Sequence, residues 1–167
     1  SEPSTATSTA SKFMRYWLMK SEPNCYSIDD LAAAGGPAMW EGCRNYQVRN
    51  MFRDMFEPGD RAFFHYSNAK PSGIVGTMRI VSKGYPDPTQ FDPNSEHPDP
   101  KSRPEAPTWL CVDVNFETKF DRIITMDELR SDPRTAGMQV LRRGQRLSVM
   151  SVESEEWAAV LEIAARK

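Results

Sequence analysis

Prolines are concentrated in one internal segment of this chain of 167 residues: seven of the 13 prolines lie between residues 84 and 108. Proline fixes φ and has no backbone N–H, so it interrupts helices and the central strands of sheets. The segment is therefore predicted to be neither a helix nor a strand. A loop of this length inside a compact domain is commonly disordered or functional, and prolines reduce the entropy lost when it is ordered. We expect a functional flap.

The segments on both sides of this flap predict an α+β fold. Aromatic and β-branched residues typical of strands occur in four runs: 16–20, 61–66, 73–82 and 109–117. Helical signals occur in four others: 28–34, 45–55, 125–132 and 157–164. The order does not alternate as βαβ units require, which disfavours a doubly wound parallel sheet. A small, mixed, largely antiparallel β-barrel flanked by helices fits the order better.

Local signals define several of these elements. Ser27 and Thr125 each begin a capping box, and Asn45 can cap the helix that follows it. Residues 61–66 and 73–82 can pair as a hairpin. Strict alternation in 109–117 predicts a half-buried strand. Its buried face is expected to hold Leu110, Val112, Val114 and Phe116, and its other face Cys111, Asp113, Asn115 and Glu117.

Composition limits the compartment and the partners. Residues 1–12 contain no large apolar residue and are predicted to be a disordered tail or a remnant of cloning, which leaves 13–167 as a single domain. A net charge of −2 excludes a protein that coats nucleic acid non-specifically. No apolar run approaches the ~20 residues of a membrane span, so no membrane partner is expected. Three cysteines, Cys25, Cys43 and Cys111, argue against a disulfide framework and for a reducing, intracellular compartment.

The usual signatures of catalysis and metal binding do not occur. The chain has two histidines, His65 and His97, and no GxSxG motif, so a nucleophile activated by a base is not apparent. The cysteines and histidines lack metal-ligand spacing, and no glycine-rich loop precedes a helix. We therefore predict no catalytic residue, no metal and no cofactor.

Aromatic and basic residues beside polar turns offer a binding alternative. Trp40 could form one wall of a slot in which Glu41 accepts a base amine, although a tryptophan is more often a core residue. Arg44 and Asn45 have an equally plain interpretation as a solvated charge and a helix cap. A basic set could form a phosphate-binding lip or a solvated surface. Its members are Lys101, Arg103, Arg142, Arg143 and Arg146.

Several motifs in the same order resemble the EVE-domain family. They are YWLMKSEP at 16–23, WEGCRNYQVRN at 40–50, SN through PSGIVG at 67–76, and YPDPT at 85–89. The resemblance extends from about Tyr16 to the C-terminus. It implies a PUA-like barrel, related to the YTH readers of methylated RNA, with a pocket for a modified base. The residues implied around that pocket are Lys20, Ser21, Trp40, Glu41, Arg44, Asn45, Tyr66, Ser67 and Asn68.

The chain departs from the family pattern at three places. His65-Tyr66 stands in the order opposite to the usual Tyr-His, which leaves open which of the two rings faces the ligand. Cys43 occupies a position where an aliphatic residue is usual. Met150 and Ser151 replace the usual Gln-Pro before the last helix.

The resemblance implies a non-enzymatic nucleic-acid-binding module that recognises a modified base, and we expect a modified cytosine in DNA, flipped into the aromatic pocket. A reader of modified RNA and an enzyme acting on a modified nucleotide are the alternatives. A monomer is expected, nuclear in a eukaryote and cytoplasmic in a bacterium.

Overall fold

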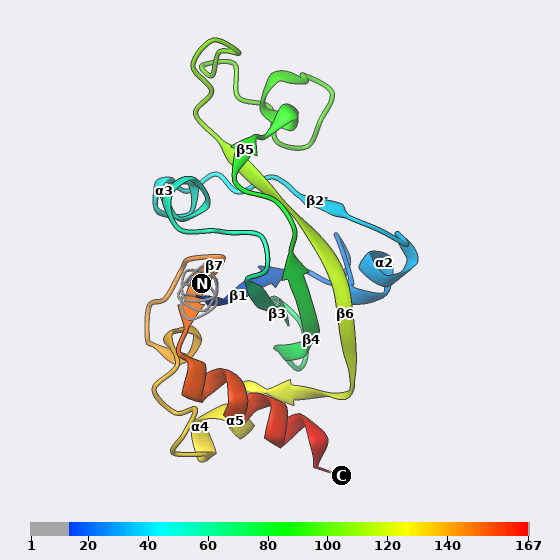
Figure 1. The fold of residues 1–167 in the computed structure, drawn as a ribbon, viewed down its shortest axis with the longest axis vertical. Coiled ribbons are helices and arrows are strands. Elements are labelled where there is room, and N and C mark those ends of the chain that lie inside the picture. The colour runs from blue at the N-terminus through cyan, green and yellow to red at the C-terminus, as the bar shows by residue number, and fades with distance from the viewer. Residues whose placement is uncertain (1–13, 167) are drawn as a thin grey trace, which may run out of the picture.

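The structure is a computed structural model that describes residues 14–166, so the prediction of a tail at 1–12 lies outside the described residues. Its centre is a curled seven-stranded sheet with the strand order β2-β6-β4-β3-β1-β7, in which β5 pairs with β6 (Figure 1). The strands are β1 (Tyr16–Ser21), β2 (Ala38–Trp40), β3 (Arg61–Tyr66), β4 (Gly73–Ile80), β5 (Tyr85–Pro86), β6 (Leu110–Thr125) and β7 (Val149–Val152).

The sheet is mixed but mostly antiparallel. The predicted hairpin of β3 and β4 is present, with Ala62 opposite Met78. Strand β1 pairs parallel with β3 and antiparallel with β7. The predicted α+β class, a largely antiparallel barrel-like sheet flanked by helices, is confirmed.

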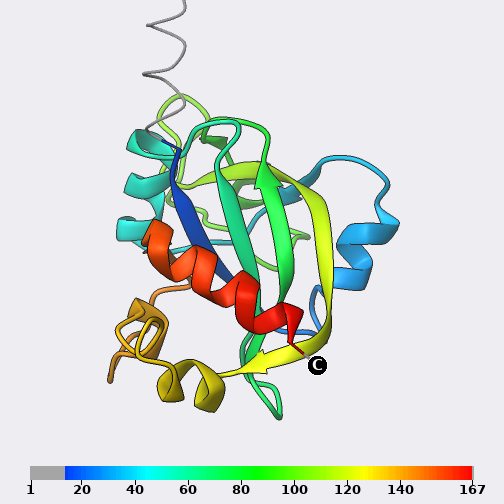
Figure 2. The ribbon, with the colours of Figure 1, turned by 60° about the horizontal axis from the view of Figure 1, so that its bottom comes forward.

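Helices cover both faces of the sheet. They are α2 (Ile28–Ala33), α3 (Tyr46–Asp54), α4 (Met126–Ser131) and α5 (Ser154–Ala165). Figure 2 shows α5 lying across one face, where its Trp157 belongs to the same apolar cluster as Leu18 of β1 and Phe63 of β3. Helices α2 and α3 contribute Ile28 and Phe52 to a second cluster. Two apolar cores therefore hold the sheet between layers of helix.

Capping residues begin the helices where the sequence indicates. The Ser27 and Thr125 side chains accept hydrogen bonds from the backbone N–H groups of Asp30 and Glu128, and both capping boxes are closed. The Asn45 side chain accepts from two N–H groups of the first turn of α3. These bonds satisfy amides that have no partner inside the helix.

The strand around residue 112 differs from its prediction. Strand β6 runs for 16 residues rather than nine, and its alternation does not hold along its length. Cys111, expected on the outer face, is completely buried, because β5 pairs with β6 at this residue. Phe116, expected in the core, is 36% exposed.

The proline-rich flap (residues 84–108) is folded around buried polar groups. It includes β5 and a short 3-10 helix, η1 (Pro88–Phe91), and it projects beyond β2 and α3 at one end of the molecule (Figure 1). Gln90 lies inside it and donates to the carbonyls of Asp87 and Trp109, while its own side-chain oxygen accepts from Ser102 and from the Trp109 N–H. Side chains rather than a regular backbone ladder hold this loop in place.

Candidate nucleic-acid interface

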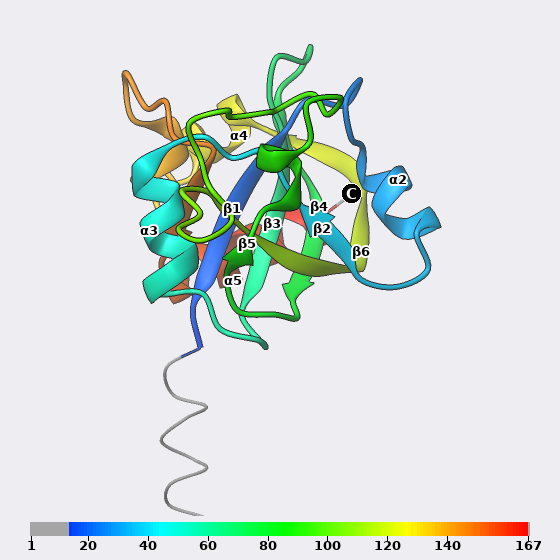
Figure 3. The ribbon, with the colours of Figure 1, turned by 90° about the horizontal axis from the view of Figure 1, so that it is seen from above.

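A cleft of about 890 Å³ lies where the end of β1, the end of β2, the flap and the loop before β7 meet. Figure 3 looks from above onto this end of the molecule, with α3 and α2 on opposite sides. Several predicted pocket residues, and one residue predicted to bind phosphate, line the cleft. They are Lys20, Ser21, Trp40, Glu41, Arg44, Ser67 and Arg146.

Trp40 belongs both to the core and to the cleft. Its side chain is only 7% exposed, and its ring meets the Phe64 ring edge-on at a centroid distance of 5.3 Å and the Tyr26 ring at 6.5 Å. These two contacts fix the indole in one orientation. The two interpretations of Trp40, core residue and pocket wall, therefore apply to the same side chain.

Three predicted pocket residues lie outside the cleft lining and support it instead. Asn45 caps α3, and the Tyr66 hydroxyl accepts from the backbone N–H of Ile28. Asn68 has a φ of 51° and donates through its side-chain amide to Glu22, which does line the cleft. His65 also points elsewhere: it is 2% exposed and lies beside the Met126 sulfur, so neither ring of the His65-Tyr66 pair lines the cleft.

Arg44 is held mainly by the flap. Its guanidinium donates to Asp87 at 3.1 Å, to Thr89 at 3.0 Å and to the carbonyl of His97 at 2.7 Å. The same Asp87 accepts from the backbone N–H of Gly42 at 2.8 Å. Burial would raise the pKa of Asp87, but the hydrogen bonds from Gly42, Thr89 and Arg44 hold that pKa below its ordinary value. The bonds of Arg44 and Gly42 to Asp87 thus join the segment that follows β2 to the flap.

The charges around the cleft are mixed. Glu22, Glu41 and Glu96 bring carboxylates to it, and Lys20 and Arg146 bring cations. Burial lowers the pKa of Lys20. The cleft can therefore accept hydrogen bonds from a bound amine and donate hydrogen bonds to carbonyl or phosphate oxygens.

Two cysteines, Cys25 and Cys43, line the cleft, and within residues 14–166 neither sulfur has a hydrogen bond to a histidine or an acidic side chain that could activate it. The Cys43 sulfur lies 4.0 Å from the Ser148 hydroxyl, and burial raises the pKa of this thiol to about 11. A thiol with that pKa is protonated at neutral pH and is a poor nucleophile. Among residues 14–166, no group of three histidine, cysteine or acidic side chains is placed to hold a metal ion.

The other predicted phosphate-binding residues lie outside the lining. Arg142 and Arg143 are exposed in the loop before β7, and within residues 14–166 their side chains have no ion pair or hydrogen bond. Lys101 and Arg103 are exposed on the flap, where Arg103 pairs with Glu105 at 3.3 Å. Arg146 connects the basic loop to the cleft.

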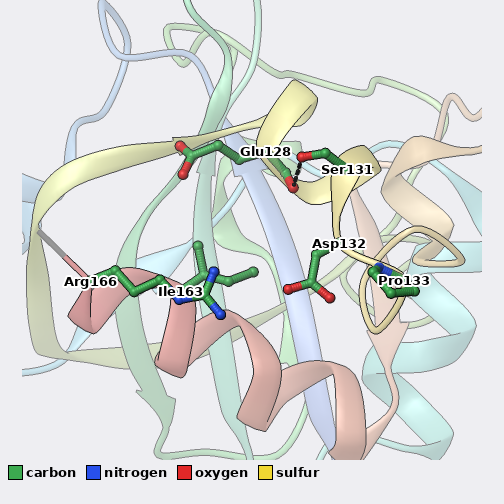
Figure 4. Close-up of a pocket in the computed structure, with 6 residues that line it drawn as sticks. All are labelled: Glu128, Ser131, Asp132, Pro133, Ile163 and Arg166. Carbon is green, nitrogen blue, oxygen red and sulfur yellow. Dashed lines mark hydrogen bonds between the residues drawn. The ribbon is translucent and has the colours of Figure 1, made fainter.

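A smaller cavity of about 230 Å³ lies between the end of α4 and the end of α5 (Figure 4). It contains none of the predicted residues. Its carboxylates already have partners: Glu128 pairs with Arg122, and hydrogen bonds from Arg134 lower the pKa of Asp132 to about 2. The larger cleft is therefore the candidate site.

Sequence reasoning missed part of the lining. The additional residues are Glu22, Cys25, Tyr26, Met39, Gly42, Cys43, Asn94, Ser95, Glu96, His97, Leu147 and Ser148. Four of them belong to the flap, whose proline content predicted a functional segment without indicating which of its residues would line the cleft. Within residues 14–166, no helix combines the length and the apolar character needed to cross a membrane.

Comparison with known proteins gives consistent results. The sequence profile of the EVE domain matches residues 15–163. Thymocyte nuclear protein 1 of Homo sapiens is 42% identical over 165 residues, which cover 89% of this chain and 73% of the human protein. An uncharacterised protein of Schizosaccharomyces pombe is 38% identical, with coverages of 89% and 68%.

Solved structures share the fold. A crystal structure of a Pseudomonas syringae protein has a TM-score of 0.84 at 42% identity and covers 89% of this chain and 99% of its own. The human THYN1 protein, crystallised in complex with 5-methylcytosine-containing DNA, has a TM-score of 0.83 at 40% identity, with coverages of 92% and 99%. The expected resemblance is confirmed, and this chain belongs to the EVE-domain family.

Proposed function

We propose that this chain is a DNA-binding module that reads 5-methylcytosine and holds the modified base, flipped out of the duplex, in the cleft beside Trp40. The observation that carries the proposal is the cleft itself, in which an orientationally fixed indole stands next to carboxylates and a half-buried lysine. The relative crystallised with 5-methylcytosine-containing DNA supports the choice of ligand.

The cleft offers the interactions that a flipped base needs. Flipping costs a few kcal/mol, which stacking and hydrogen bonds to the base edge must offset. Trp40 supplies an aromatic surface, and Glu41 can accept a hydrogen bond from the exocyclic amine of cytosine. Met39 and Leu147 add apolar lining against which a methyl group can be buried.

Basic residues near the cleft are proposed to hold the phosphates. Arg142, Arg143 and Arg146 form one group beside the cleft, and Lys101 and Arg103 lie on the flap. Contacts to phosphate fix the position of a protein on the duplex without reading its sequence. They also make affinity fall as salt rises.

We propose binding without turnover, because burial keeps the Cys43 thiol protonated and, within residues 14–166, none of the carboxylates of the lining is hydrogen-bonded to His97, Lys20 or a cysteine. A reader of modified RNA is the alternative. As a single-domain, monomeric module, the protein would be nuclear in a eukaryote, in keeping with relatives named as nuclear proteins.

A binding panel tests this proposal. Duplexes with one 5-methylcytosine, their unmodified counterparts and matched RNAs are titrated into the protein while the bases are monitored for conversion. We expect preference for the methylated duplex, no product, and a ten- to hundredfold loss of affinity in Trp40→Ala, since a stacked base contributes ~1–3 kcal/mol. Because Trp40 is also a core residue, Trp40→Phe, which keeps an aromatic ring, accompanies it.

Glu41→Gln separates reading from catalysis. An amide both donates and accepts, whereas a carboxylate only accepts, so this change should alter the ratio of affinities for methylated and unmodified duplexes. A wild-type protein that converts its ligand, together with a Glu41→Gln variant that binds normally and converts nothing, would establish an enzyme.

A further inference from the structure

The His97 side chain is a polar group of the cleft with unused hydrogen-bonding capacity. Its imidazole is partly exposed and lines the cleft, and within residues 14–166 its ring nitrogens have no hydrogen-bond partner. A neutral imidazole carries one donor and one acceptor. Both are free for a molecule that occupies the cleft.

The backbone of His97 is held from two sides. Its carbonyl accepts from the Arg44 guanidinium at 2.7 Å, and its N–H donates to the Ser95 hydroxyl oxygen at 3.2 Å. The Ser95 hydroxyl in turn donates to the carbonyl of Thr89 at 2.7 Å. The imidazole is therefore carried on a fixed backbone rather than on a free loop.

The anchor of this arrangement is Asp87. Its side chain has no exposed surface, and it accepts from Arg44, from the Gly42 N–H and from the Thr89 N–H at 2.8 Å. The Arg44 guanidinium also donates to the Thr89 hydroxyl oxygen and to the His97 carbonyl. The position of the imidazole thus depends on a carboxylate ten residues earlier in the flap.

Gly42 determines how close the ring comes to the opposite wall. Its φ is +85°, and a β-carbon at this position would lie 2.7 Å from Nε2 of His97. The imidazole therefore occupies the space that a side chain at residue 42 would fill, next to Glu41.

We infer that His97 contacts the bound base and reads its hydrogen-bonding edge, and that Asp87 and Arg44 are positioning residues that place it there. The inference rests on the proposed function. Cytosine presents one amine and two acceptors on its pairing edge, so the Glu41 carboxylate suits the amine and the His97 N–H suits a neighbouring acceptor. The Glu41 carboxylate can only accept hydrogen bonds, so the donor that an acceptor of the base needs comes from His97.

The test exploits the presence of two histidines in the chain. NMR signals of both imidazoles are followed while a duplex containing one 5-methylcytosine is added, and His65→Gln assigns them. We expect the His97 signals to shift and those of the buried His65 to stay in place. Unchanged His97 signals at saturation would overturn the inference.

Variants measure the contribution of the contact. His97→Ala should lose about tenfold in affinity for the methylated duplex, the loss of one hydrogen bond, and His97→Gln, which keeps a donor, should lose less. Asp87→Asn should move the His97 signals of the free protein and weaken binding similarly. Asp121→Asn, the same kind of substitution at an exposed position of β6 outside the cleft lining, is the control and should bind as the wild type does.

The outcomes separate the two proposals. A wild-type protein that prefers the methylated duplex while His97→Ala retains full affinity refutes the role of His97 alone. A wild-type protein with no preference for the methylated duplex refutes the proposed function, and the role of His97 with it.

Discussion

The imidazole of His97 lies directly against the α-carbon of Gly42, although 55 positions separate the two residues in the chain. This contact joins the flap to the segment that follows β2 and closes one side of the cleft. It depends on a residue without a β-carbon at position 42 and on the hydrogen bonds of Arg44 and Asp87 beneath it.

Replacing Gly42 by alanine should therefore open the cleft. Alanine at a positive φ costs about 1–2 kcal/mol of stability, and the new methyl group would also displace the His97 ring. Gly35→Ala is the matched control, because Gly35 has a φ of +69° but no atom within 4 Å of its β-carbon position. Thermal unfolding and binding of methylated DNA should both be affected more in Gly42→Ala, whereas equal effects would show that the contact is unimportant.

Replacing Arg142 and Arg143 by alanine should weaken binding to methylated and unmodified duplexes alike. The slope of log affinity against log salt is negative, and each lost phosphate contact should reduce its magnitude by about 0.9. The control is the double variant Arg53→Ala and Arg130→Ala, which removes the same charge from two exposed arginines paired with Asp54 and Asp127. Identical slopes in both double variants would point to overall charge rather than to a local contact.

Acid should destabilise the fold through His65. Burial and the nearby Lys20 lower the pKa of this imidazole from 6.5 to about 4, so the folded state favours the neutral form. Between pH 4 and pH 6.5 the unfolded chain binds more protons at His65 than the folded chain does. The contribution of neutral His65 to the free energy of unfolding is therefore complete above pH 6.5 and is lost as pH falls toward 4. The shift corresponds to about 3 kcal/mol. Urea unfolding of the wild type and His65→Gln between pH 7.5 and 4.5 should show a steeper loss in the wild type, and parallel curves would exclude this role.

The three cysteines should differ in reactivity. Cys25 is exposed, whereas burial raises the pKa of Cys43 to about 11 and that of Cys111 to about 12. Because the thiolate is the reactive form, a thiol reagent at pH 7.5 should modify one cysteine rapidly and the other two only after unfolding. The rapid phase should disappear in Cys25→Ser. A second rapid phase in the folded protein would show that the Cys43 thiol is accessible from the cleft.

Local signals were sufficient for much of the fold. Ser27, Asn45 and Thr125 cap helices through bonds that span two or three residues, so the sequence near each helix start contains all the information required. The hairpin of β3 and β4 was likewise predictable, because a short turn joins two runs of strand-forming residues. The family motifs added Lys20, Ser21, Trp40, Glu41, Arg44 and Ser67, all of which line the cleft.

Other features depend on partners that are distant in the sequence. The short strands β2 and β7 were not predicted, since each is a strand only because β6 and β1 lie beside it. Cys111 is buried because β5 pairs with β6 there, which no alternation within residues 109–117 could reveal.

The division between sequence and structure is clearest at Arg44. Its residue type and its place in a family motif indicated a group near a binding pocket, and it does line the cleft. That its guanidinium would be committed to Asp87, Thr89 and the His97 carbonyl could not be read from the sequence, because these partners lie 43 to 53 positions away. Short-range hydrogen bonds and apolar periodicity are properties of the sequence itself. The meeting of the flap with residues 42–44 exists only after the sheet has curled and brought them together.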